Sequence, residues 1–417
     1  MADRGGSRGG LRRLTVTFLA ASVVALVSPA PGRVAAATPP VIVPVRTDPV
    51  AAERPVLTAG VRRSLQARLV QLRDKYGIPG ISVAIIFPDG RTWTGTDGTA
   101  DLAAGTPVTP ETAFAIASIS KTFTSALVMA LVQDGTVRLE APVRNYLPEL
   151  EIDARVTVRQ LLDHTSGLRD YFLDPRIDRA LLKDTARWWD EADALAYVGK
   201  PYFKPGRGWH YSNTNYLVLG MLAERVGRAP LADQLRERFL EPLGLSRTYY
   251  QPTESPRGPV ANGYRFASTS TKAKAVDLSD GSTIVPFTSV VTAAAGAGGI
   301  ASSAGDIARW ARALYEGDAL TEATVGTMVG DVARTDRYRP SVPYGLGVQA
   351  AGIVGRPALG HSGRLLGFRS VVRWLPDEGV AIAVLTNQSR TDPAIVARSL
   401  LRIALRSAPS CACRGVR

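Results

Sequence analysis

Cysteine, histidine and lysine are scarce in this chain of 417 residues. It has two Cys and three His, and the cysteines, Cys411 and Cys413, both lie in the polar C-terminal tail. Two neighbouring tail cysteines cannot cross-link a fold, so no disulfide framework is expected. The histidines show none of the paired spacings typical of a zinc site. The sequence therefore predicts no metal and no cofactor, and packing alone must hold the core.

Long apolar runs are absent except close to the start. Several arginines precede an apolar run over 14–27, and small residues follow at 35–37, an order typical of an export signal. The run is shorter than the roughly 20 apolar residues that cross a bilayer as a helix. We therefore predict a signal peptide over 1–37, a secreted or cell-envelope protein, and no stable membrane span after signal removal. Arg12 and Arg13 leave a twin-arginine route open beside the general one.

Acidic residues fall short of basic ones, 37 against 50, which gives a net charge of +13. The predicted signal contributes +4 and residues 406–417 contribute +3, so 13 − 4 − 3 leaves about +6 for the remainder. No stripe of basic and aromatic residues accompanies this mild excess, so we predict no nucleic-acid partner. A basic surface does favour an anionic polymer of the cell envelope, and peptidoglycan is a candidate neighbour.

Hydrophobic residues make up 45% of the chain, enough for a large core. We predict an extended leader over 38–57, one folded domain over 58–405 and a flexible basic tail over 406–417. Helical patterns dominate the region from about 111 to 315, and strand patterns bracket it. These patterns predict the α/β (α+β) class: an antiparallel sheet formed by both chain ends and flanked by helices, plus a mainly helical inserted region. The cleft between the two parts is the predicted site.

Two hairpins are predicted within that sheet. One joins Ile81–Phe87 to Arg91–Gly95, and the other joins Phe368–Leu375 to Val380–Thr386. Each pair flanks a turn that contains Pro, Asp and Gly, which are typical turn residues. A closing helix is predicted over Asp392–Leu405.

The strongest local pattern is Ser118-Ile119-Ser120-Lys121, which is predicted to open a helix over Ser118–Asp134. Positions i and i+3 share a helix face, so the Ser118 hydroxyl and the Lys121 amine can meet. The helix N-terminus stabilises negative charge that develops on the serine. Only seven of the 50 basic residues are Lys and the other 43 are Arg. Because arginine cannot lose its proton, a lysine here indicates a proton acceptor for a nucleophilic serine.

A Ser-x-x-Lys pattern also arises by chance, and two elements downstream give it weight. Tyr211-Ser212-Asn213 and His361-Ser362-Gly363 follow in order. With these three elements the chain resembles the serine β-lactamase and penicillin-binding-protein superfamily. The similarity is to the branch of class C β-lactamases and D-alanyl-D-alanine carboxypeptidases, over roughly residues 60–405. Further stretches that carry the resemblance are 114–118, 160–168, 211–220, 261–264, 344–347 and 360–363.

The resemblance implies that Tyr211 exchanges protons with Ser118 and with the leaving group. A phenol held near an amine can serve as both base and acid. Asn213 is implied to bind a substrate amide oxygen. The alternative for Asn213 is a capping role at the helix expected to start at Asn215, and Tyr211 could instead be an ordinary core tyrosine.

The third element is implied to be a strand edge beside the nucleophile. His361, Ser362 and Gly363 would pair with an extended acyl donor, and glycine would let the backbone approach closely. The backbone N–H groups of Ser118 and Arg364 are implied to donate to the oxyanion. His361 stands where many relatives have lysine, and the alternative for it is a plain edge-strand histidine.

Two other patterns resemble hydrolase motifs. Gly5–Gly9 fits G-x-S-x-G, but it precedes the export signal and lacks the strand and helix that this motif requires. Asp163, His164 and Ser166 resemble a catalytic triad, yet triad members meet through the fold and not by adjacency. We predict a structural role for this segment.

The resemblance implies a serine hydrolase acting on a small peptide, an ester or a β-lactam, with a D-alanyl-D-alanine carboxypeptidase favoured. One position departs from that pattern: Gln349 replaces the arginine that pairs with a terminal carboxylate, and a neutral amide cannot supply that charge. Either Arg364 or Arg369 compensates, or an esterase or D-aminopeptidase is favoured instead. A class C-like β-lactamase ranks lower because nothing in the sequence ensures fast deacylation. A non-catalytic protein that binds penicillin or cell-wall peptides is the alternative from another class, and intact Ser118 and Lys121 argue against it.

Overall fold

The structure is a computed structural model that describes residues 54–407 except positions 269, 272, 331, 334 and 336–341. The predicted signal peptide, most of the predicted leader and the chain from residue 408 on lie outside the described residues. Within the described part, no helix is both long enough and apolar enough to cross a bilayer.

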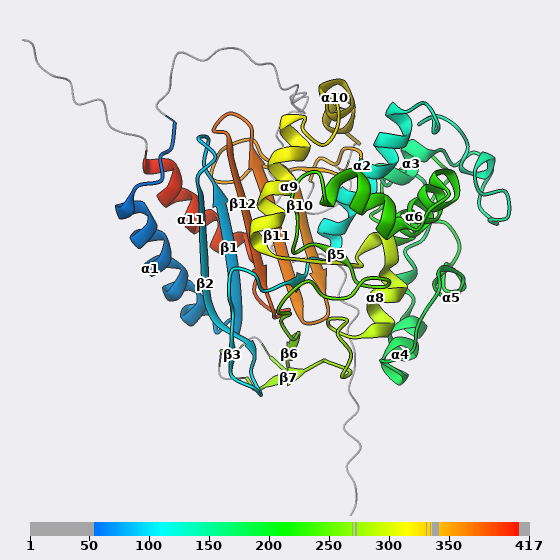
Figure 1. Cartoon of the computed structure of the whole chain (residues 1–417). Helices are drawn as coiled ribbons and strands as arrows, with labels where there is room; N and C mark the ends of the chain where they lie inside the picture. Colours follow the sequence, from blue (N-terminus) through cyan, green and yellow to red (C-terminus); the bar gives the residue numbers. More distant parts are fainter. Residues whose placement is uncertain are drawn as a thin grey trace, which may run out of the picture.

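A seven-stranded antiparallel sheet forms the middle of the molecule (Figure 1). Its strand order is β3-β2-β1-β12-β11-β10-β9, so strands from the two ends of the domain lie side by side. They meet at the pair β1–β12, where Ile81 lies opposite Thr386. The strands are β1 Gly80–Ile86, β2 Thr92–Asp101, β3 Thr106–Pro107, β9 Gln349–Ala350, β10 Leu359–Leu365, β11 Phe368–Leu375 and β12 Val380–Thr386.

Helices cover both faces of the sheet, and every residue of β1 and β12 is buried. Leu65 and Leu69 of the first helix pack with Leu400 of the last helix over one face. Burying each such side chain contributes about 1.5–3 kcal/mol. The helices involved are α1 Ala59–Tyr76 and α11 Ala394–Ala404 on that face, and α9 Ala304–Glu316 on the other (Figure 1).

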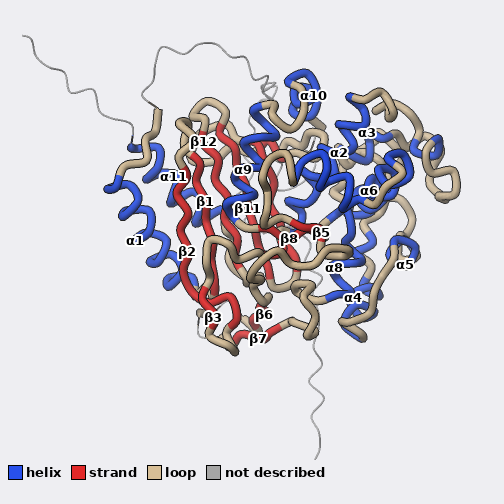
Figure 2. The backbone as a smooth tube through the Cα atoms, viewed as in Figure 1, coloured by secondary structure: helices blue, strands red, loops and turns tan. Residues whose placement is uncertain are grey.

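The remaining helices form a second region beside the sheet (Figure 2). Its centre is the packed pair α2 and α6, and the remaining short strands form a three-stranded sheet, β4-β8-β5, and a two-stranded sheet, β6-β7. The helices are α2 Ser120–Gln133, α3 Val158–Leu162, α4 Pro175–Lys183, α5 Glu191–Leu195, α6 Asn213–Gly227, α7 Leu231–Leu235, α8 Thr288–Ala294 and α10 Glu322–Gly330. The short strands are β4 Phe114–Ala115, β5 Tyr249–Tyr250, β6 Tyr264–Phe266, β7 Ala275–Asp277 and β8 Ile300–Ser302.

The predicted fold class is confirmed: an antiparallel sheet built from both chain ends, flanked by helices, with a helical region between them. The second predicted hairpin matches β11 and β12 to the residue. In the first hairpin, β2 continues to Asp101 and not to Gly95. Residues 96–98 of this extension pair with β1, and its far end pairs with β3.

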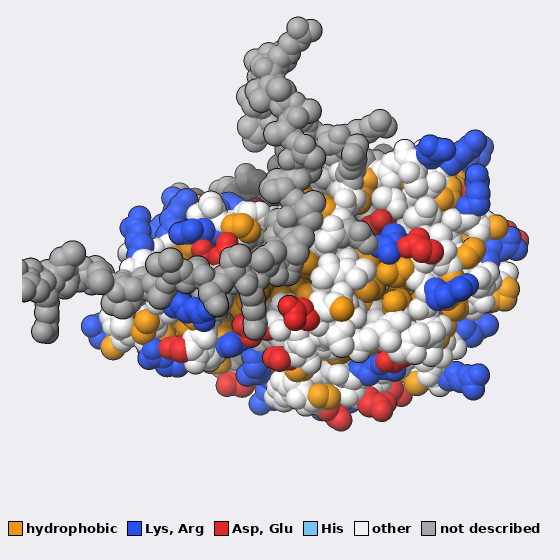
Figure 3. Space-filling model, turned by 90° about the horizontal axis from the view of Figure 1, so that it is seen from above, with side chains coloured by type: hydrophobic (Ala, Val, Ile, Leu, Met, Phe, Trp, Pro, Cys, Tyr) orange, Lys and Arg blue, Asp and Glu red, His pale blue; other side chains and the backbone are white. Residues whose placement is uncertain are grey.

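Charged side chains are mixed over the face seen from above, where Lys and Arg stand mainly around the rim with Asp and Glu among them (Figure 3). Ion pairs such as Arg225–Glu149 and Arg238–Asp134 join the two signs. Such exposed pairs contribute little to stability, about 0–1 kcal/mol each. They do balance part of the basic excess locally.

Candidate active site

Ser118 lies on a tight turn that enters α2. It is the middle residue of a 3₁₀ turn, η1 (Ala117–Ile119), and the α-helix begins at Ser120, two residues later than predicted. Ala117 has a φ of 52°, a left-handed conformation that costs a non-glycine residue about 1–2 kcal/mol. Ala117 and Ile119 are buried while Ser118 is partly exposed. The strained turn therefore presents the serine side chain and hides its neighbours.

Two strands of the sheet hold this turn in place. The Ser370 hydroxyl on β11 donates to the Ile116 carbonyl at 2.7 Å. Gly363 on β10 lies so close that a Cβ there would be 2.3 Å from the same carbonyl oxygen. The sequence predicted that Gly363 lets an extended acyl donor approach the strand closely, and in the structure the segment that approaches it is the turn that carries Ser118.

The Lys121 side chain is 0% exposed, and its Nζ lies 3.2 Å from Ser118 Oγ. Nζ also donates to the Ala297 carbonyl at 2.7 Å and to Asn213 Oδ1 at 2.8 Å. A neutral amine has two N–H groups and one lone pair. Because the two oxygens occupy both N–H groups, the lone pair is left to accept the Ser118 proton.

Burial lowers the pKa of Lys121 from 10.5 to about 7, while the charge of Asp170 acts in the opposite direction. The amine is therefore neutral in a large fraction of molecules near neutral pH. A general base must be in that state to take a proton.

Tyr211 lies against the same amine, whose Nζ is 5.1 Å from the centre of the tyrosine ring. The Tyr211 hydroxyl is buried without a well-aligned hydrogen bond to any described residue. Burial raises the pKa of Tyr211 well above its ordinary value, and the nearby Ser118 hydroxyl lowers it only in part. The phenol consequently holds its proton at rest and can give it to a stronger base. The structure thus brings Ser118, Lys121 and Tyr211 together.

Asn213 is the first residue of α6, and Ser212 is the capping residue. The Asn213 side chain does not cap the helix. Its Oδ1 accepts from Lys121, and its Nδ2 donates to Asp170 Oδ2 at 3.0 Å. The alternative of a capping role is therefore wrong, and sequence reasoning missed Asp170, which carries no motif of its own.

His361 of β10 is buried and bonded on both ring nitrogens. Its Nδ1 lies 2.7 Å from the Ser362 carbonyl, which only accepts, so Nδ1 carries the proton. Nε2 then accepts from the Tyr344 hydroxyl at 2.9 Å. Burial lowers the pKa of His361 to about 3, so the ring stays neutral. The position of the lysine of many relatives is thus occupied by an uncharged group whose ring lies 6.3 Å from that of Tyr211.

A polar cluster at β10 consists of Gln349, Ser362 and Arg373. Gln349 and Arg373 both lie opposite Gly360 in the sheet register, with no side chain between them. Arg373 Nη2 donates to Gln349 Oε1 at 3.1 Å, and Ser362 Oγ lies 3.3 Å from both amide atoms. Because guanidinium only donates, Oε1 faces Arg373 and the amide N–H faces Ser362. The sequence pointed to Arg369 or Arg364, whereas Arg373 is the arginine that contacts Gln349.

The outer edge of β10 has no strand partner among the described residues beyond Gly360, because β9 pairs only with Leu359 and Gly360. An extended acyl group can therefore add to this edge. β10 contacts η1, so Arg364 and Ser118 lie on neighbouring segments. Their backbone N–H groups remain the predicted oxyanion donors.

The segment Asp163–Ser166 is not arranged as a triad. Asp163 accepts from the backbone and hydroxyl of Thr165 at 2.9 and 2.6 Å. His164 accepts at Nδ1 from the Ser212 N–H at 3.2 Å. Its ring centre lies 4.3 Å from that of Tyr211, so the histidine packs against this tyrosine.

Residues 65–406 match the family described as Beta-lactamase. The chain belongs to this family. Among curated relatives, it is 31% identical over 342 residues to penicillin-binding protein 4 of Amycolatopsis lactamdurans, covering 77% of this chain and 84% of that protein. It is 29% identical to a D-aminopeptidase of Cereibacter sphaeroides over 82% of this chain, but spans 63% of that longer protein.

Solved structures with the same architecture support the fold. The D-amino acid amidase of Ochrobactrum anthropi SV3, complexed with D-phenylalanine, superposes with a TM-score of 0.71 at 25% identity, covering 84% of this chain and 100% of that one. A D-stereospecific amidohydrolase from Streptomyces sp. gives a TM-score of 0.69 at 27% identity, covering 84% and 98%. These relatives are hydrolases, in agreement with a hydrolytic role for the family fold here.

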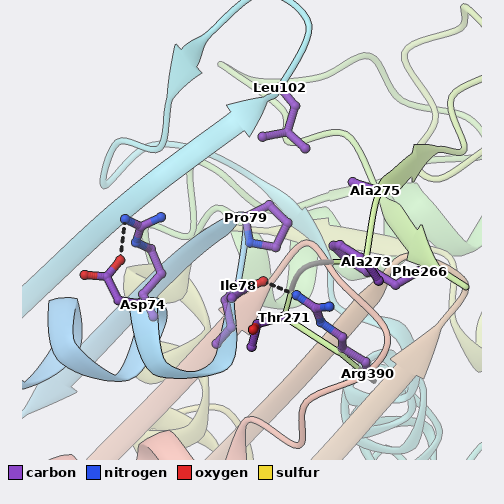
Figure 4. Close-up of a pocket in the computed structure, with 11 residues that line it drawn as sticks. Asp74, Ile78, Pro79, Leu102, Phe266, Thr271, Ala273, Ala275 and Arg390 are labelled. Atoms are coloured by element: carbon purple, nitrogen blue, oxygen red, sulfur yellow. Dashed lines mark hydrogen bonds and ion pairs between the residues drawn. The ribbon is translucent and has the colours of Figure 1, made fainter. Parts of the chain in front are cut away.

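A separate recess of about 300 Å³ lies between the end of α1 and the β6–β7 pair (Figure 4). Arg390 lines it, donating to the Ser270 carbonyl at 2.5 Å and to the Gly77 carbonyl. Ser118, Lys121, Tyr211 and Asn213 are not among the residues that line it. Ser118 and Lys121 of this beta-lactamase-family chain therefore lie elsewhere, where β10 meets η1 and the packed helices α2 and α6.

Proposed function

We propose that this protein is an exported serine hydrolase that cleaves amide bonds of small D-amino-acid substrates through an acyl-enzyme on Ser118. The observation that carries the proposal is the buried Lys121 amine, 3.2 Å from Ser118 Oγ, with both of its N–H groups directed at other acceptors. Esters and β-lactams present the same electrophilic acyl carbon and are related substrates.

Acylation begins when Ser118 Oγ attacks the substrate carbonyl and its proton passes to Lys121. The carbonyl oxygen becomes an oxyanion, which the backbone N–H groups of Ser118 and Arg364 stabilise. The tetrahedral intermediate then expels the amine. Tyr211 gives its proton to that leaving group and recovers one from Lys121, so the acyl-enzyme forms with the base neutral again.

Deacylation uses the same groups in reverse. Water attacks the Ser118 ester and passes a proton to the Tyr211 and Lys121 pair. The ester bond then breaks, and Ser118 Oγ takes the proton back as the acid product leaves. The proton balance requires no residue other than Ser118, Lys121 and Tyr211.

The substrate class rests on two observations. A D-amino acid amidase and a D-stereospecific amidohydrolase are among the relatives with similar structures. In the polar cluster beside β10, Gln349 donates its amide N–H to Ser362, and the guanidinium of Arg373 donates to the amide oxygen from the other side. A neutral donor suits the carbonyl oxygen of an amide, whereas a free carboxylate prefers a charged partner.

The second candidate is the D-alanyl-D-alanine carboxypeptidase that the sequence favours. Penicillin-binding proteins are among the relatives. Arg373 also brings a positive charge into contact with Gln349, the position at which a substrate carboxylate was expected to pair. For this activity the carboxylate would have to reach Arg373 past Gln349.

A substrate comparison tests both candidates. The purified protein is given D-phenylalanine amide, its L-enantiomer, a peptide ending in D-Ala-D-Ala, a short-chain ester and a cephalosporin, each with wild type and Ser118→Ala. We expect the D-amide to be hydrolysed faster than the L-amide, with a loss of about 10³-fold or more in the variant. Release of D-alanine as the main reaction selects the second candidate, and equal rates with the variant refute both.

Export is part of the proposal and rests on the predicted signal peptide over 1–37. Expression of the full chain in an exporting bacterial host, followed by N-terminal sequencing, tests it. Cleavage near residue 37 is expected, and an intact N-terminus on cytoplasmic protein contradicts it. Retention of the mature protein by isolated peptidoglycan tests the candidate cell-wall neighbour in the same preparation.

A further inference from the structure

A buried carboxylate lies behind the catalytic lysine. Asp170 is the capping residue of the turn η3 (Tyr171–Leu173), and it is only 5% exposed. Its Oδ1 accepts from the Phe172 backbone N–H at 3.1 Å, and its Oδ2 accepts from Asn213 Nδ2 at 3.0 Å. Among the described residues no Lys or Arg forms an ion pair with it, so its charge serves no salt bridge there.

The contact with Asp170 determines which way the Asn213 amide points. An amide side chain can rotate so that its oxygen and nitrogen exchange places, and only the partners decide between the two arrangements. An ionised carboxylate accepts and never donates, so it must face Nδ2. Oδ1 is thereby directed at Lys121 Nζ, 2.8 Å away. Without the carboxylate, Nδ2 can face the lysine, where one donor meets another.

The orientation of Asn213 in turn determines where the Lys121 lone pair points. Ala297 provides one fixed acceptor for the amine at 2.7 Å and Asn213 Oδ1 provides the second. Only with both in place do the two N–H groups point away from Ser118. If Asn213 rotates, the amine can turn one N–H toward the serine oxygen and lose its function as a base.

We propose that Asp170 is a positioning residue that acts through Asn213 to keep the lone pair of Lys121 on the Ser118 hydroxyl. The inference rests on the proposed function, because it concerns the same nucleophile and base. Asp170 itself does not contact the reacting atoms, and its effect passes through two hydrogen bonds.

The charge of Asp170 has a second, opposite effect, which makes the proposal testable. It stabilises the protonated form of Lys121 and so raises the lysine pKa, against the larger effect of burial. Removing the carboxylate therefore moves the acid limb of the acylation rate to lower pH while it reduces the plateau. The other titratable groups around the amine are Tyr211, Tyr216, His164 and His361.

The experiment compares the rate at which a fluorescent penicillin labels the wild type and two variants from pH 5 to 9. Asp170→Asn and Asp170→Ser both retain an acceptor for the Phe172 N–H, so the cap of η3 is preserved. For each we expect a plateau about 10- to 100-fold lower and an acid limb at lower pH. Far-UV circular dichroism and the melting temperature establish that the variants fold.

Asp163→Asn is the matched control. Asp163 is also a largely buried carboxylate, with its pKa raised to about 6 by burial like that of Asp170, but its hydrogen bonds go to Thr165. This variant is expected to keep the wild-type plateau and limb. Equal losses at 163 and 170, or unchanged labelling by both Asp170 variants, overturn the proposal.

Two further outcomes are separable. If the wild type is neither labelled at Ser118 nor able to hydrolyse D-phenylalanine amide, the proposed function fails, and if it is labelled while the Asp170 variants behave like it, only this inference fails. If neither variant folds, neutron diffraction from the wild type decides. The proposal requires an Asn213 N–D bond directed at Asp170 and is refuted by one directed at Lys121.

Discussion

Lys121→Met is predicted to change how the stability of the protein depends on pH. The lysine pKa is about 7 in the folded protein and 10.5 as the ordinary value. Between these two values the unfolded chain binds a proton that the folded chain does not, so wild-type stability rises with pH by up to about 1.4 kcal/mol per unit. From pH 6.5 to 9 the contribution of this one group sums to about 2.5 kcal/mol. Methionine cannot titrate and lacks that gain.

The assay is urea unfolding of wild type and variant at both pH values, with the difference in unfolding free energy as the readout. The hydrogen bonds lost from Ala297 and Asn213 shift both measurements alike and cancel in the comparison. The variant is expected to lose about 2.5 kcal/mol relative to the wild type as pH rises from 6.5 to 9. Lys75→Met, on the exposed side of α1, is the control and should leave the pH dependence unchanged. A difference between wild type and Lys121→Met that is independent of pH refutes the neutral, buried lysine.

Three further predictions concern activity and packing. Lys121→Arg should lower the acylation rate, measured by penicillin labelling, by about 10²–10⁴-fold, because guanidinium cannot act as a base. The labelling rate of the wild type should rise with pH through about 7, and a rate that does not change with pH contradicts this. Gln349→Arg should raise kcat/KM for a substrate with a terminal carboxylate by about tenfold relative to kcat/KM for the corresponding amide. If the ratio of these two values is unchanged, Gln349 plays no part in substrate selection. Gly363→Ala should destabilise the protein by about 1–3 kcal/mol, since the added Cβ would lie 2.3 Å from the Ile116 oxygen. A melting temperature equal to that of the wild type argues against this close approach.

Local spacing explains what could be predicted from the sequence. Ser118 and Lys121 are three residues apart where the helical turn η1 runs on into α2, so their contact follows from local helical geometry. The hairpin of β11 and β12 was predictable because its turn residues and apolar strands are contiguous in the chain. Tyr211 could be placed near them only by the resemblance, since nothing in its own neighbourhood points to position 118.

The contacts that orient these groups have no local signal. The Ala297 acceptor is a backbone carbonyl, which any residue provides. Asp170 and Asn213 are separated by 43 positions, and neither shows a spacing that predicts their hydrogen bond. Arg373 was overlooked because its role depends on the sheet register, which places it and Gln349 on either side of Gly360.

The central claim is that Ser118 is the nucleophile, and mass spectrometry of a trapped acyl-enzyme tests it most directly. The wild type is incubated with a fluorescent penicillin, its intact mass is measured and the adduct is located by peptide mapping. One adduct per chain on the peptide that contains Ser118, absent from Ser118→Ala, is the predicted result. An adduct on another residue, or equal labelling of the variant, contradicts the account.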